Sequence, residues 1–315
     1  MSEILTITLN PALDVSTSVA AVTPGPKLRC TEPRYDPGGG GVNVSRAIQR
    51  LGGAAHAFVA LGGETGEAFR AMLDDEKIVA EVFEVAGNTR QSIAVGETST
   101  GKQFRFQLPC PDWPADQTER LLDRLETVLD EDCLAVLSGS VPGGVPQDIA
   151  IRVNRMAVDQ GARLILDTSG AALTAASGNP GPPIFLLRMD GAEAAEVSGR
   201  SFANPADLAD YGRELVARGV ADHLVMSMGA KGTVGVSASE RFFVSPPKLA
   251  VVSAVGAGDS MVAAIALELS RGSSFREAVR HGVAAAGSAV LTPATQLCSR
   301  ETMDEILTRV MTSEI

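Results

Sequence analysis

The sequence predicts an α/β fold: a doubly wound, mostly parallel sheet with flanking helices and a small β-sheet lid. Short apolar runs alternate with segments of helical periodicity along most of the 315 residues, which is typical of parallel strands joined by crossover helices. Hydrophobic residues make up 45% of the chain and aromatic residues 4%, so an aliphatic core is expected, which suits a buried sheet. No linker or repeat divides the sequence, and we expect residues 1–315 to form a single domain.

The main sheet is predicted from apolar runs, and the helices from the amphipathic segments between them. The expected strands are residues 4–9, 57–61, 134–138, 164–167, 184–187 and 223–227. The expected helices are residues 44–51, 118–129, 148–160 and 205–218, with a further one from residue 260. In the first of these helices, Val44, Ala47, Ile48 and Leu51 share one face, and Gly52 follows its end.

Two segments, residues 15–35 and 80–108, carry strand-like patterns without a convincing helix. We expect them to form a small antiparallel sheet outside the main layer, acting as a lid, a dimer contact or both. Residues 96–103 nearly match a phosphate-binding P-loop, but Gln103 stands where that loop needs a hydroxyl group. We interpret this stretch as a hairpin turn.

Composition excludes several classes of protein. A net charge of −11 argues against a nucleic-acid or anionic-membrane partner. The four scattered cysteines predict neither a disulfide framework nor a zinc site, and the three histidines lack metal or catalytic-triad spacing. The N-terminus lacks the pattern of a signal peptide and no apolar run approaches the ~20 residues of a membrane span, so we expect a cytoplasmic protein.

The most informative motif is Gly256-Ala257-Gly258-Asp259, which leads into an apolar run of helix formers. Small residues at a helix start let an anion approach the free backbone N–H groups and the positive end of the helix dipole. A carboxylate there would repel the anion unless the chemistry needs a base. The motif therefore indicates phosphoryl transfer with Asp259 activating a hydroxyl; the alternative is a glycine-rich turn with Asp259 as a helix cap.

A second glycine-rich stretch, residues 38–43, also precedes a helix. It begins about thirty residues after the first strand, too far for a dinucleotide-binding fingerprint. Its glycines permit a ligand to approach backbone amides closely, and Asn43 offers a donor and an acceptor for sugar hydroxyls. A flexible loop is the alternative. Asp14 lies just past the first strand, where ligands of α/β sheets gather, although a lone aspartate in a turn is usually structural.

Four cations, Lys27, Arg29, Arg90 and Arg105, fall in the two lid segments. In so acidic a protein, cations brought together there could clamp a phosphate group. Separate surface cations are the alternative, because the sequence does not show that the four side chains converge.

Together these features resemble the ribokinase-like (PfkB-type) family of sugar kinases over nearly the whole chain. Within that family the sequence is most similar to the minor bacterial 6-phosphofructokinases. The stretches that carry the resemblance are residues 10–14, 27–30, 37–43 and 255–262. The related 1-phosphofructokinases and tagatose-6-phosphate kinases usually have Lys in place of Gly40, which makes Gly40 a discriminator.

The resemblance implies that Asp259 is the catalytic base and that Gly256, Ala257 and Gly258 form an anion hole. The sugar phosphate would be bound by Asp14, Lys27, Arg29, Gly39, Gly40, Asn43, Arg90, Arg105 and Ser138. ATP would be bound by Arg188, Ser227, Gly229, Lys231 and Gly232, and Mg²⁺ by Asp190 and Glu193. The lid would pair with that of a second subunit in a homodimer.

Two stretches depart from the family pattern. The usual Lys-Pro-Asn-x-x-Glu element, tied to magnesium and the nucleotide phosphates, is Arg188-Met189-Asp190-Gly191-Ala192-Glu193 here. Near the C-terminus, Thr292, Ala294 and Gln296 stand where close relatives tend to have Asn, Gly and Arg beside a monovalent-cation site. Dependence on K⁺ is therefore left open.

These implications favour ATP-dependent phosphorylation of the 1-hydroxyl of fructose 6-phosphate, giving fructose 1,6-bisphosphate. Two alternatives stay open. One is a kinase for another phosphosugar, such as tagatose 6-phosphate or fructose 1-phosphate. The other is a sugar-phosphate-binding protein with weak catalysis. A nicotinamide-dependent dehydrogenase is disfavoured by the placement of the glycines.

Overall fold

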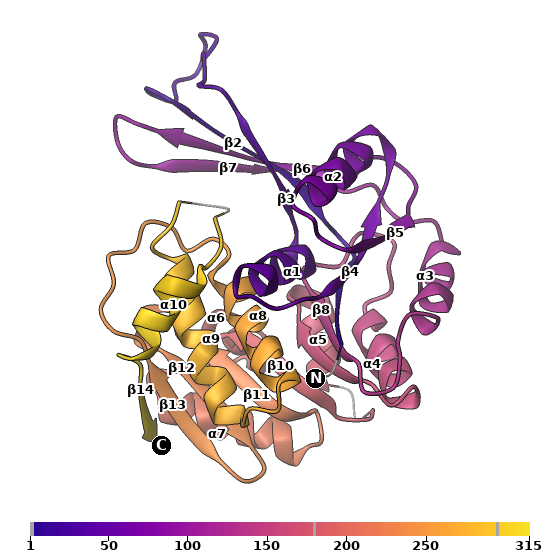
Figure 1. The fold of residues 1–315 in the computed structure, drawn as a ribbon, viewed down its shortest axis with the longest axis vertical. Coiled ribbons are helices and arrows are strands. Elements are labelled where there is room, and N and C mark those ends of the chain that lie inside the picture. Colours follow the sequence, from indigo (N-terminus) through magenta and orange to yellow (C-terminus); the bar gives the residue numbers. More distant parts are fainter. Residues whose placement is uncertain (1–2, 179–180, 294–295) are drawn as a thin grey trace.

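The computed structural model describes residues 3–178, 181–293 and 296–315, and strands and helices alternate along most of that length (Figure 1). The strands are β1 (Ile4–Thr8), β2 (Ala12–Val19), β3 (Arg34–Gly38), β4 (His56–Leu61), β5 (Ala80–Glu84), β6 (Arg90–Glu97), β7 (Gln103–Gln107), β8 (Leu134–Ser138), β9 (Arg163–Asp167), β10 (Ile184–Asp190), β11 (Ala221–Ser227), β12 (Thr233–Ser237), β13 (Arg241–Ser245) and β14 (Met311–Glu314). The helices are α1 (Gly40–Arg50), α2 (Gly63–Asp75), α3 (Gln117–Glu126), α4 (Ile149–Asp159), α5 (Gly170–Gly178), α6 (Gly191–Ser198), α7 (Pro205–Ala217), α8 (Ala257–Ser270), α9 (Phe275–Ala289) and α10 (Arg300–Leu307), with a 3₁₀ turn η1 (Gly229–Lys231).

Among the described residues, the main sheet has ten strands in the order β14-β13-β12-β11-β10-β9-β8-β1-β4-β5. The pairs from β5 to β11 are parallel, and β12, β13 and β14 add antiparallel strands at one edge. The six predicted strands are all present. The chain winds outward from β1 in both directions, which confirms the predicted doubly wound, mostly parallel sheet.

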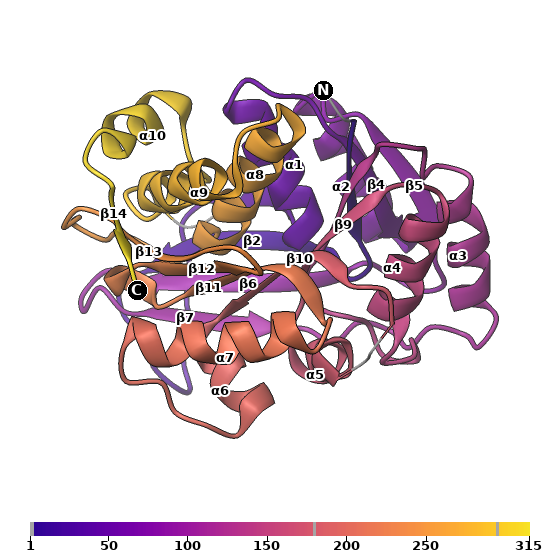
Figure 2. The ribbon, with the colours of Figure 1, turned by 90° about the horizontal axis from the view of Figure 1, so that it is seen from below.

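Helices cover both faces of the main sheet (Figure 2). Helices α1, α2, α8, α9 and α10 pack on one face, and α3 to α7 pack on the other. Strand β8 serves both faces because successive side chains of a strand point in opposite directions: Leu134 and Val136 join one core cluster, and Ala135 and Leu137 join the other. Within the described residues, no helix combines the length and apolar character that a membrane crossing needs.

Helix α1 begins four residues earlier than predicted, because the glycine-rich stretch forms its first turn. A Cβ atom added to Gly40 would lie 2.5 Å from the backbone nitrogen of Gly139, and one added to Gly41 would lie 2.5 Å from Thr8 Oγ1. These distances leave no room for a side chain, so glycine lets α1 pack directly on the ends of β1 and β8. The flexible-loop alternative is therefore wrong.

The lid is a four-stranded sheet in the order β3-β2-β6-β7, counted over the described residues. Strands β2 and β3, and β6 and β7, pair antiparallel as predicted, while β2 and β6 join the two hairpins in parallel. The lid stands apart from the main sheet, and the β2–β3 connection extends beyond it (Figure 1). Residues 96–103 form the predicted hairpin turn.

One boundary of the lid was wrongly predicted. Residues 80–108 were expected to belong to it throughout, but β5, at the start of this segment, pairs in parallel with β4 and forms an edge of the main sheet. Most side chains of β5 are only half-buried, like those of a lid strand, because an edge strand has a neighbouring strand on one side only. A local pattern does not distinguish the two positions.

Candidate active site

The candidate active site lies beyond the carboxyl ends of the parallel strands, where ligands of α/β sheets gather. Ser138 and Asp167 end β8 and β9, and Arg188 lies two residues before the end of β10. The three are register partners and form a row across the sheet. Ser138 Oγ donates to Asp167 Oδ2 over 2.9 Å, and Arg188 Nη1 donates to Asp167 Oδ1 over 3.1 Å. The row reaches the first turn of α8, because a Cβ atom on Gly258 would lie 3.3 Å from Arg188 Nη2.

Asp259 occupies the third position of α8 and does not cap it. The helix begins at Ala257, and Gly256 takes the cap position with a φ of 77°, a left-handed conformation that favours glycine. The Asp259 carboxylate accepts a 2.8 Å hydrogen bond from Asn43 Nδ2, and Asn43 lies in the first turn of α1. The helix-cap alternative for Asp259 is therefore wrong, and two glycine-rich helix starts meet at one carboxylate.

The surroundings of Asp259 suit a general base. Desolvation by burial raises the pKa of Asp259 from 3.8 to about 7, and the charge of Asp167 adds to the increase. The hydrogen bond from Asn43 and the charge of Arg188 oppose it. A base whose pKa lies near the working pH is deprotonated there and still has an appreciable affinity for a proton.

A cavity of about 870 Å³ opens beside the first turn of α8 and has the size of a nucleotide site. Ala257 and Gly258 line it at the start of α8. Its apolar wall is formed by Leu249, Val251, Met261, Val283, Ala286 and Val290. Such a wall can receive a flat, weakly polar ring while the helix start receives an anion.

The residues predicted to bind ATP are mostly found at this cavity. The described lining includes Arg188, Ser227, Gly229 and Gly232. Lys231 is not part of that lining and lies exposed in η1. Lys248, which no sequence motif indicated, lines the cavity and supplies a cation there.

Arg188 is held tightly within the lining of the cavity. Its Nη2 donates to Ser227 Oγ over 3.1 Å, and its Nη1 lies 4.0 Å from Glu193 Oε2. Burial lowers the pKa of Arg188, but the charges of Asp167 and Glu193 outweigh burial and leave the pKa above its ordinary value. Its buried Nε has no partner in the described structure, so the guanidinium keeps a donor for a ligand.

Asp190 and Glu193, the predicted metal ligands, form a capping box at the start of α6. Asp190 Oδ1 accepts from the backbone N–H groups of Ala192 and Glu193 over 2.8 and 2.9 Å. Glu193 Oε2 accepts from the N–H group of Asp190 over 2.7 Å. The described part of the chain has no group of three His, Cys, Asp or Glu side chains placed to hold a metal ion. A metal ion here would therefore need further oxygen ligands, from water or from a bound phosphate.

On the lid side, Asp14 of β2 faces polar groups of β6 and β7. Desolvation raises the pKa of Asp14 to about 6, whereas a hydrogen bond with Ser92 and the charges of Arg90 and Arg105 act to lower it. A Cβ atom on Gly38 would collide with the Asp14 carboxylate, so glycine leaves room for it. The structure thus brings together Asp14 and two of the four predicted cations.

Lys27 and Arg29, the other two predicted cations, do not join this cluster. Within the cluster, Arg90 Nη2 donates to the backbone oxygen of Asn10 over 3.3 Å, and the buried Nε of Arg90 has no partner among the described residues. Lys27 and Arg29 lie on the exposed β2–β3 connection, and no described contact links them to Asp14. A single chain therefore assembles half of the predicted clamp.

Asp167, like Lys248, is a residue of this site that no sequence motif singled out. It ends β9 and accepts hydrogen bonds from Ser138 and Arg188. The available signal was its position as the last residue of the predicted strand 164–167. Carboxyl ends of parallel strands meet at one edge of a sheet, so a carboxylate there was a candidate.

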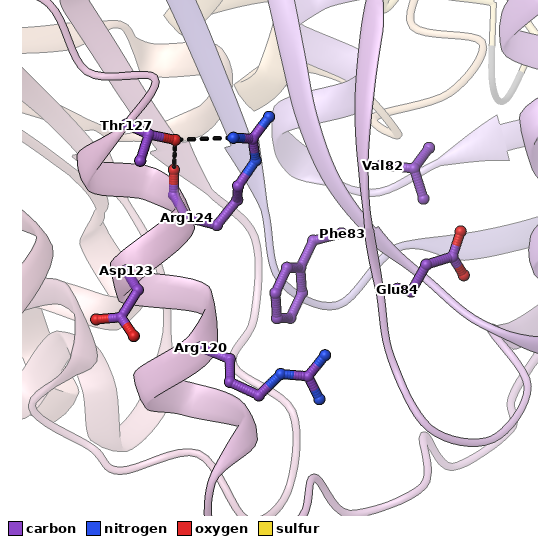
Figure 3. Close-up of a pocket in the computed structure, with 7 residues that line it drawn as sticks. All are labelled: Val82, Phe83, Glu84, Arg120, Asp123, Arg124 and Thr127. Carbon is purple, nitrogen blue, oxygen red and sulfur yellow. Dashed lines mark hydrogen bonds between the residues drawn. The ribbon is translucent and has the colours of Figure 1, made fainter.

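A second hollow, of about 500 Å³, lies between β5 and α3 (Figure 3). Phe83 lies among the charged side chains of this hollow, and Arg124 Nη1 donates to Thr127 Oγ1 over 2.9 Å. The described lining shares no residue with the larger cavity and contains none of the predicted site residues. This hollow is therefore separate from the candidate active site.

Known proteins are similar in sequence to this chain over most of its length. Residues 7–303 match the pfkB family carbohydrate kinases. The chain is 41% identical to ATP-dependent 6-phosphofructokinase isozyme 2 of Mycobacterium tuberculosis, covering 96% of this chain and 88% of that protein. It is 38% identical to the Escherichia coli protein of the same name, covering 97% and 98%. It is 33% identical to 1-phosphofructokinase of Xanthomonas campestris, covering 84% and 83%. The chain belongs to the pfkB family of carbohydrate kinases.

Solved structures of phosphofructokinase-2 from Escherichia coli share the fold, each covering 98% of this chain and 99% of that one. The complex with fructose-6-phosphate has a TM-score of 0.90 at 37% identity. The complex with potassium has a TM-score of 0.93 at 38% identity, and the tetrameric inhibited form 0.91 at 37%. The fold is ribokinase-like, and the enzyme is a sugar kinase that transfers phosphate to a hydroxyl group.

Proposed function

We propose that this protein transfers the terminal phosphoryl group of ATP to the 1-hydroxyl of fructose 6-phosphate, giving fructose 1,6-bisphosphate and ADP. The position of Asp259 carries the proposal. Its neighbours Ala257 and Gly258 line the nucleotide-sized cavity, and Asn43, which holds its carboxylate, lies in the first turn of α1, the helix next to the lid. A base at the junction of two ligand sites is what phosphoryl transfer to a hydroxyl requires.

In the proposed mechanism, Asp259 accepts the proton of the sugar hydroxyl as that oxygen attacks the terminal phosphorus. The bond from that phosphorus to the bridging oxygen breaks, and ADP leaves. The N–H groups at the start of α8 and the guanidinium of Arg188 stabilise the charge on the transferring group. The pinned position of Arg188 and its unpartnered Nε support this role.

The sugar phosphate is proposed to lie between the row of strand ends and the lid. Asp14, Asn43, Ser138 and the backbone at Gly39 would bind its hydroxyls. Arg90 and Arg105 would bind its phosphate, with Lys27 and Arg29 supplied by the lid of a second subunit. Gly40 supports 6-phosphofructokinase through the resemblance, because the related 1-phosphofructokinases and tagatose-6-phosphate kinases usually have Lys there. In this structure Gly139 leaves no room for a side chain at residue 40.

A magnesium ion bound with ATP would supply positive charge to neutralise the phosphates, which would provide most of its ligands. Asp190 fits this ion because it lines the cavity with one oxygen engaged in the capping box. Glu193 is turned into that box and toward Arg188, so we assign it to positioning the start of α6.

Potassium is proposed as an activator. The residues predicted to lie beside its site differ from those usual in close relatives. Thr292 Oγ1 donates to the backbone oxygen of Gln296 and, over 2.8 Å, to that of Ala289. Ala294 lies outside the described residues. Turnover measured with K⁺ and with a large organic cation in its place tests this activation.

A coupled ADP-release assay with magnesium-ATP and a panel of sugar phosphates tests the proposed function. The expected result is a kcat/KM for fructose 6-phosphate at least ten-fold above those for tagatose 6-phosphate and fructose 1-phosphate. Preference for fructose 1-phosphate would favour a 1-phosphofructokinase. Ligand binding without turnover would favour the sugar-phosphate-binding protein.

We also propose a homodimer formed through the lid sheets. Tyr35, Phe106 and Leu108 support it, because these large apolar side chains are exposed on the lid strands and just past β7. Phe106→Asp should lower the mass measured by light scattering from two chains to one, and the matched surface variant Val158→Asp on α4 should not. A wild-type mass of one chain would contradict the proposal.

A further inference from the structure

The side chain of Arg46 is completely enclosed in the structure, although arginine is rarely buried without a reason. It lies on α1 one turn after Asn43, the residue that holds Asp259. Its Nε and Nη2 donate to the two carboxylate oxygens of Glu76 over 2.7 and 2.6 Å. Such a two-bond contact fixes the plane of the guanidinium as well as its position.

Arg46 also contacts the lid. Its Nη1 donates to the backbone oxygen of Pro37 in β3 over 3.1 Å, and its Nη2 lies 3.6 Å from Asp36 Oδ1. Asp36 is buried and faces Asp14 across the β2–β3 ladder. One guanidinium therefore joins the first helix, the end of α2 and the root of the lid.

The location of Glu76 indicates that this contact serves more than the stability of α2. Glu76 is the C-cap residue of α2, and a carboxylate at a helix C-terminus faces the negative end of the helix dipole. The arrangement is unfavourable for α2 alone. It becomes favourable because Glu76 neutralises and orients the enclosed guanidinium.

We infer that Arg46 is a positioning residue that fixes the root of the lid relative to Asn43 and Asp259. Through β3 it sets the place of Asp14, and through α1 it sets the place of Asn43. The inference deepens the proposed function, because it gives the sugar-phosphate site a residue that touches no substrate. The nucleotide cavity has no lining residue on β2, β3, α1 or α2 among its described contacts, so the effect should be confined to the sugar side.

Steady-state kinetics of Arg46→Lys test this. Lysine keeps the charge but loses the two-bond contact and the bond to Pro37. A small misplacement of a binding group can cost up to roughly 100-fold, so we expect KM for fructose 6-phosphate to rise about ten-fold. KM for magnesium-ATP should stay within about two-fold. A purely structural role would lower the active fraction, reducing kcat with both KM values unchanged, and that result would overturn the inference.

Arg152→Lys is the matched control. Arg152 on α4 makes a two-bond contact with Glu119 on α3, over 2.8 and 2.6 Å, far from the lid. This variant should leave both KM values unchanged. Glu76→Gln is the second variant, used if Arg46→Lys does not fold, and should raise the sugar-phosphate KM by about three-fold because an amide oxygen can still accept one hydrogen bond.

Hydrogen exchange provides a readout that needs no substrate. In Arg46→Lys, amides of β2 and β3 should exchange about ten-fold faster than in the wild type, with β11 and β12 unchanged. Unchanged exchange in β2 and β3 would overturn the inference. If the wild-type enzyme shows no turnover of fructose 6-phosphate, the proposed function fails, whereas this measurement still decides the role of Arg46.

Discussion

Helices α1 and α8 both begin with glycine-rich turns, yet glycine serves different purposes in the two. At the start of α1, Cβ atoms on Gly40 and Gly41 would meet the ends of the strands at 2.5 Å, so the chain itself fills the space. At the start of α8, Gly258 lines the open cavity, and a Cβ atom added to it would come no closer than 3.3 Å to its nearest neighbour, Arg188. Gly40 and Gly41 permit close packing of α1, whereas Gly258 leaves room for a ligand at the start of α8.

The two turns nevertheless cooperate at one point. Asn43 ends the packed turn of α1 and Asp259 ends the open turn of α8, and a hydrogen bond joins them. Close packing of α1 therefore fixes the position of Asn43 and, through its hydrogen bond, that of Asp259, the proposed base. Substitutions in the two turns should separate effects on stability from effects on catalysis.

The largest effect is expected from Asp259→Asn. Loss of a general base costs up to roughly 10⁴-fold, and we expect kcat to fall about 1000-fold. The midpoint of urea unfolding should not fall, because the amide removes a desolvated carboxylate. A kcat within ten-fold of the wild type would contradict the assignment of Asp259 as base.

Gly41→Ala and Gly258→Ala test the comparison directly. Gly41→Ala should lower the free energy of unfolding by about 1–3 kcal/mol, because the new methyl group has no space against Thr8. Gly258→Ala should change it by less than about 1 kcal/mol, because alanine favours the helix. Urea denaturation measures both, and equal losses of stability would break the comparison.

In catalysis the order should be reversed, with Gly258→Ala losing more activity than Gly41→Ala. Gly258→Ala should lower kcat/KM for magnesium-ATP about ten-fold, since its methyl group presses on Arg188 at the site of charge development. The folded fraction of Gly41→Ala should keep a wild-type KM for magnesium-ATP.

The pH profile should report the two carboxylates with raised pKa values. Asp259 must be deprotonated to act, so kcat/KM should rise about five-fold between pH 6 and 7, by about a further two-fold between pH 7 and 8, and level off above 8. Below pH 6 the slope should steepen as Asp14 also becomes protonated. A profile flat from pH 5 to 8 would contradict both assignments.

The raised pKa of Asp259 acts on stability with the opposite sign. Between pH 4 and 7 the folded protein holds a proton that the unfolded chain has released. The contribution of Asp259 to the free energy of unfolding therefore falls as the pH rises through this window. Asp259→Asn should remove this part of the dependence.

The smallest effect is expected from Asp190→Asn, which restores the residue usual in the family. Asparagine caps a helix about as well as aspartate, so thermal stability should change by less than about 1 kcal/mol. KM for magnesium-ATP should stay within about three-fold if the ATP phosphates hold most of the metal. A ten-fold increase would instead make Asp190 a main magnesium ligand.

Much of the fold and the candidate base could be predicted from local patterns. The apolar runs identified the main strands because a buried parallel strand is apolar on both faces. The Gly256–Asp259 turn indicated Asp259 as the candidate base, because helix starts bind anions and a carboxylate there suggests a base. The β5 boundary and the start of α1 were misplaced, because both depend on which strands happen to be neighbours.

Residues of the site that come from different strands were harder to predict. Asp167 belongs to the site because it accepts hydrogen bonds from Ser138 and Arg188. These two residues are distant from it in sequence, and the sheet register places them beside it. The four lid cations look equivalent in the sequence, but only Arg90 and Arg105 act on Asp14 among the described contacts.

The sequence by itself determined the class of fold, the two glycine-rich helix starts and the identity of Asp259 as the candidate base. These follow from periodicity and from the chemistry of a helix N-terminus, which are local properties. The tertiary structure decided that one glycine-rich turn is packed and the other open, that Asp190 and Glu193 cap a helix, and that Arg46 joins the lid to the body. Each of these depends on which distant atoms come within a few ångströms, and contact at that scale is set by packing of the whole chain.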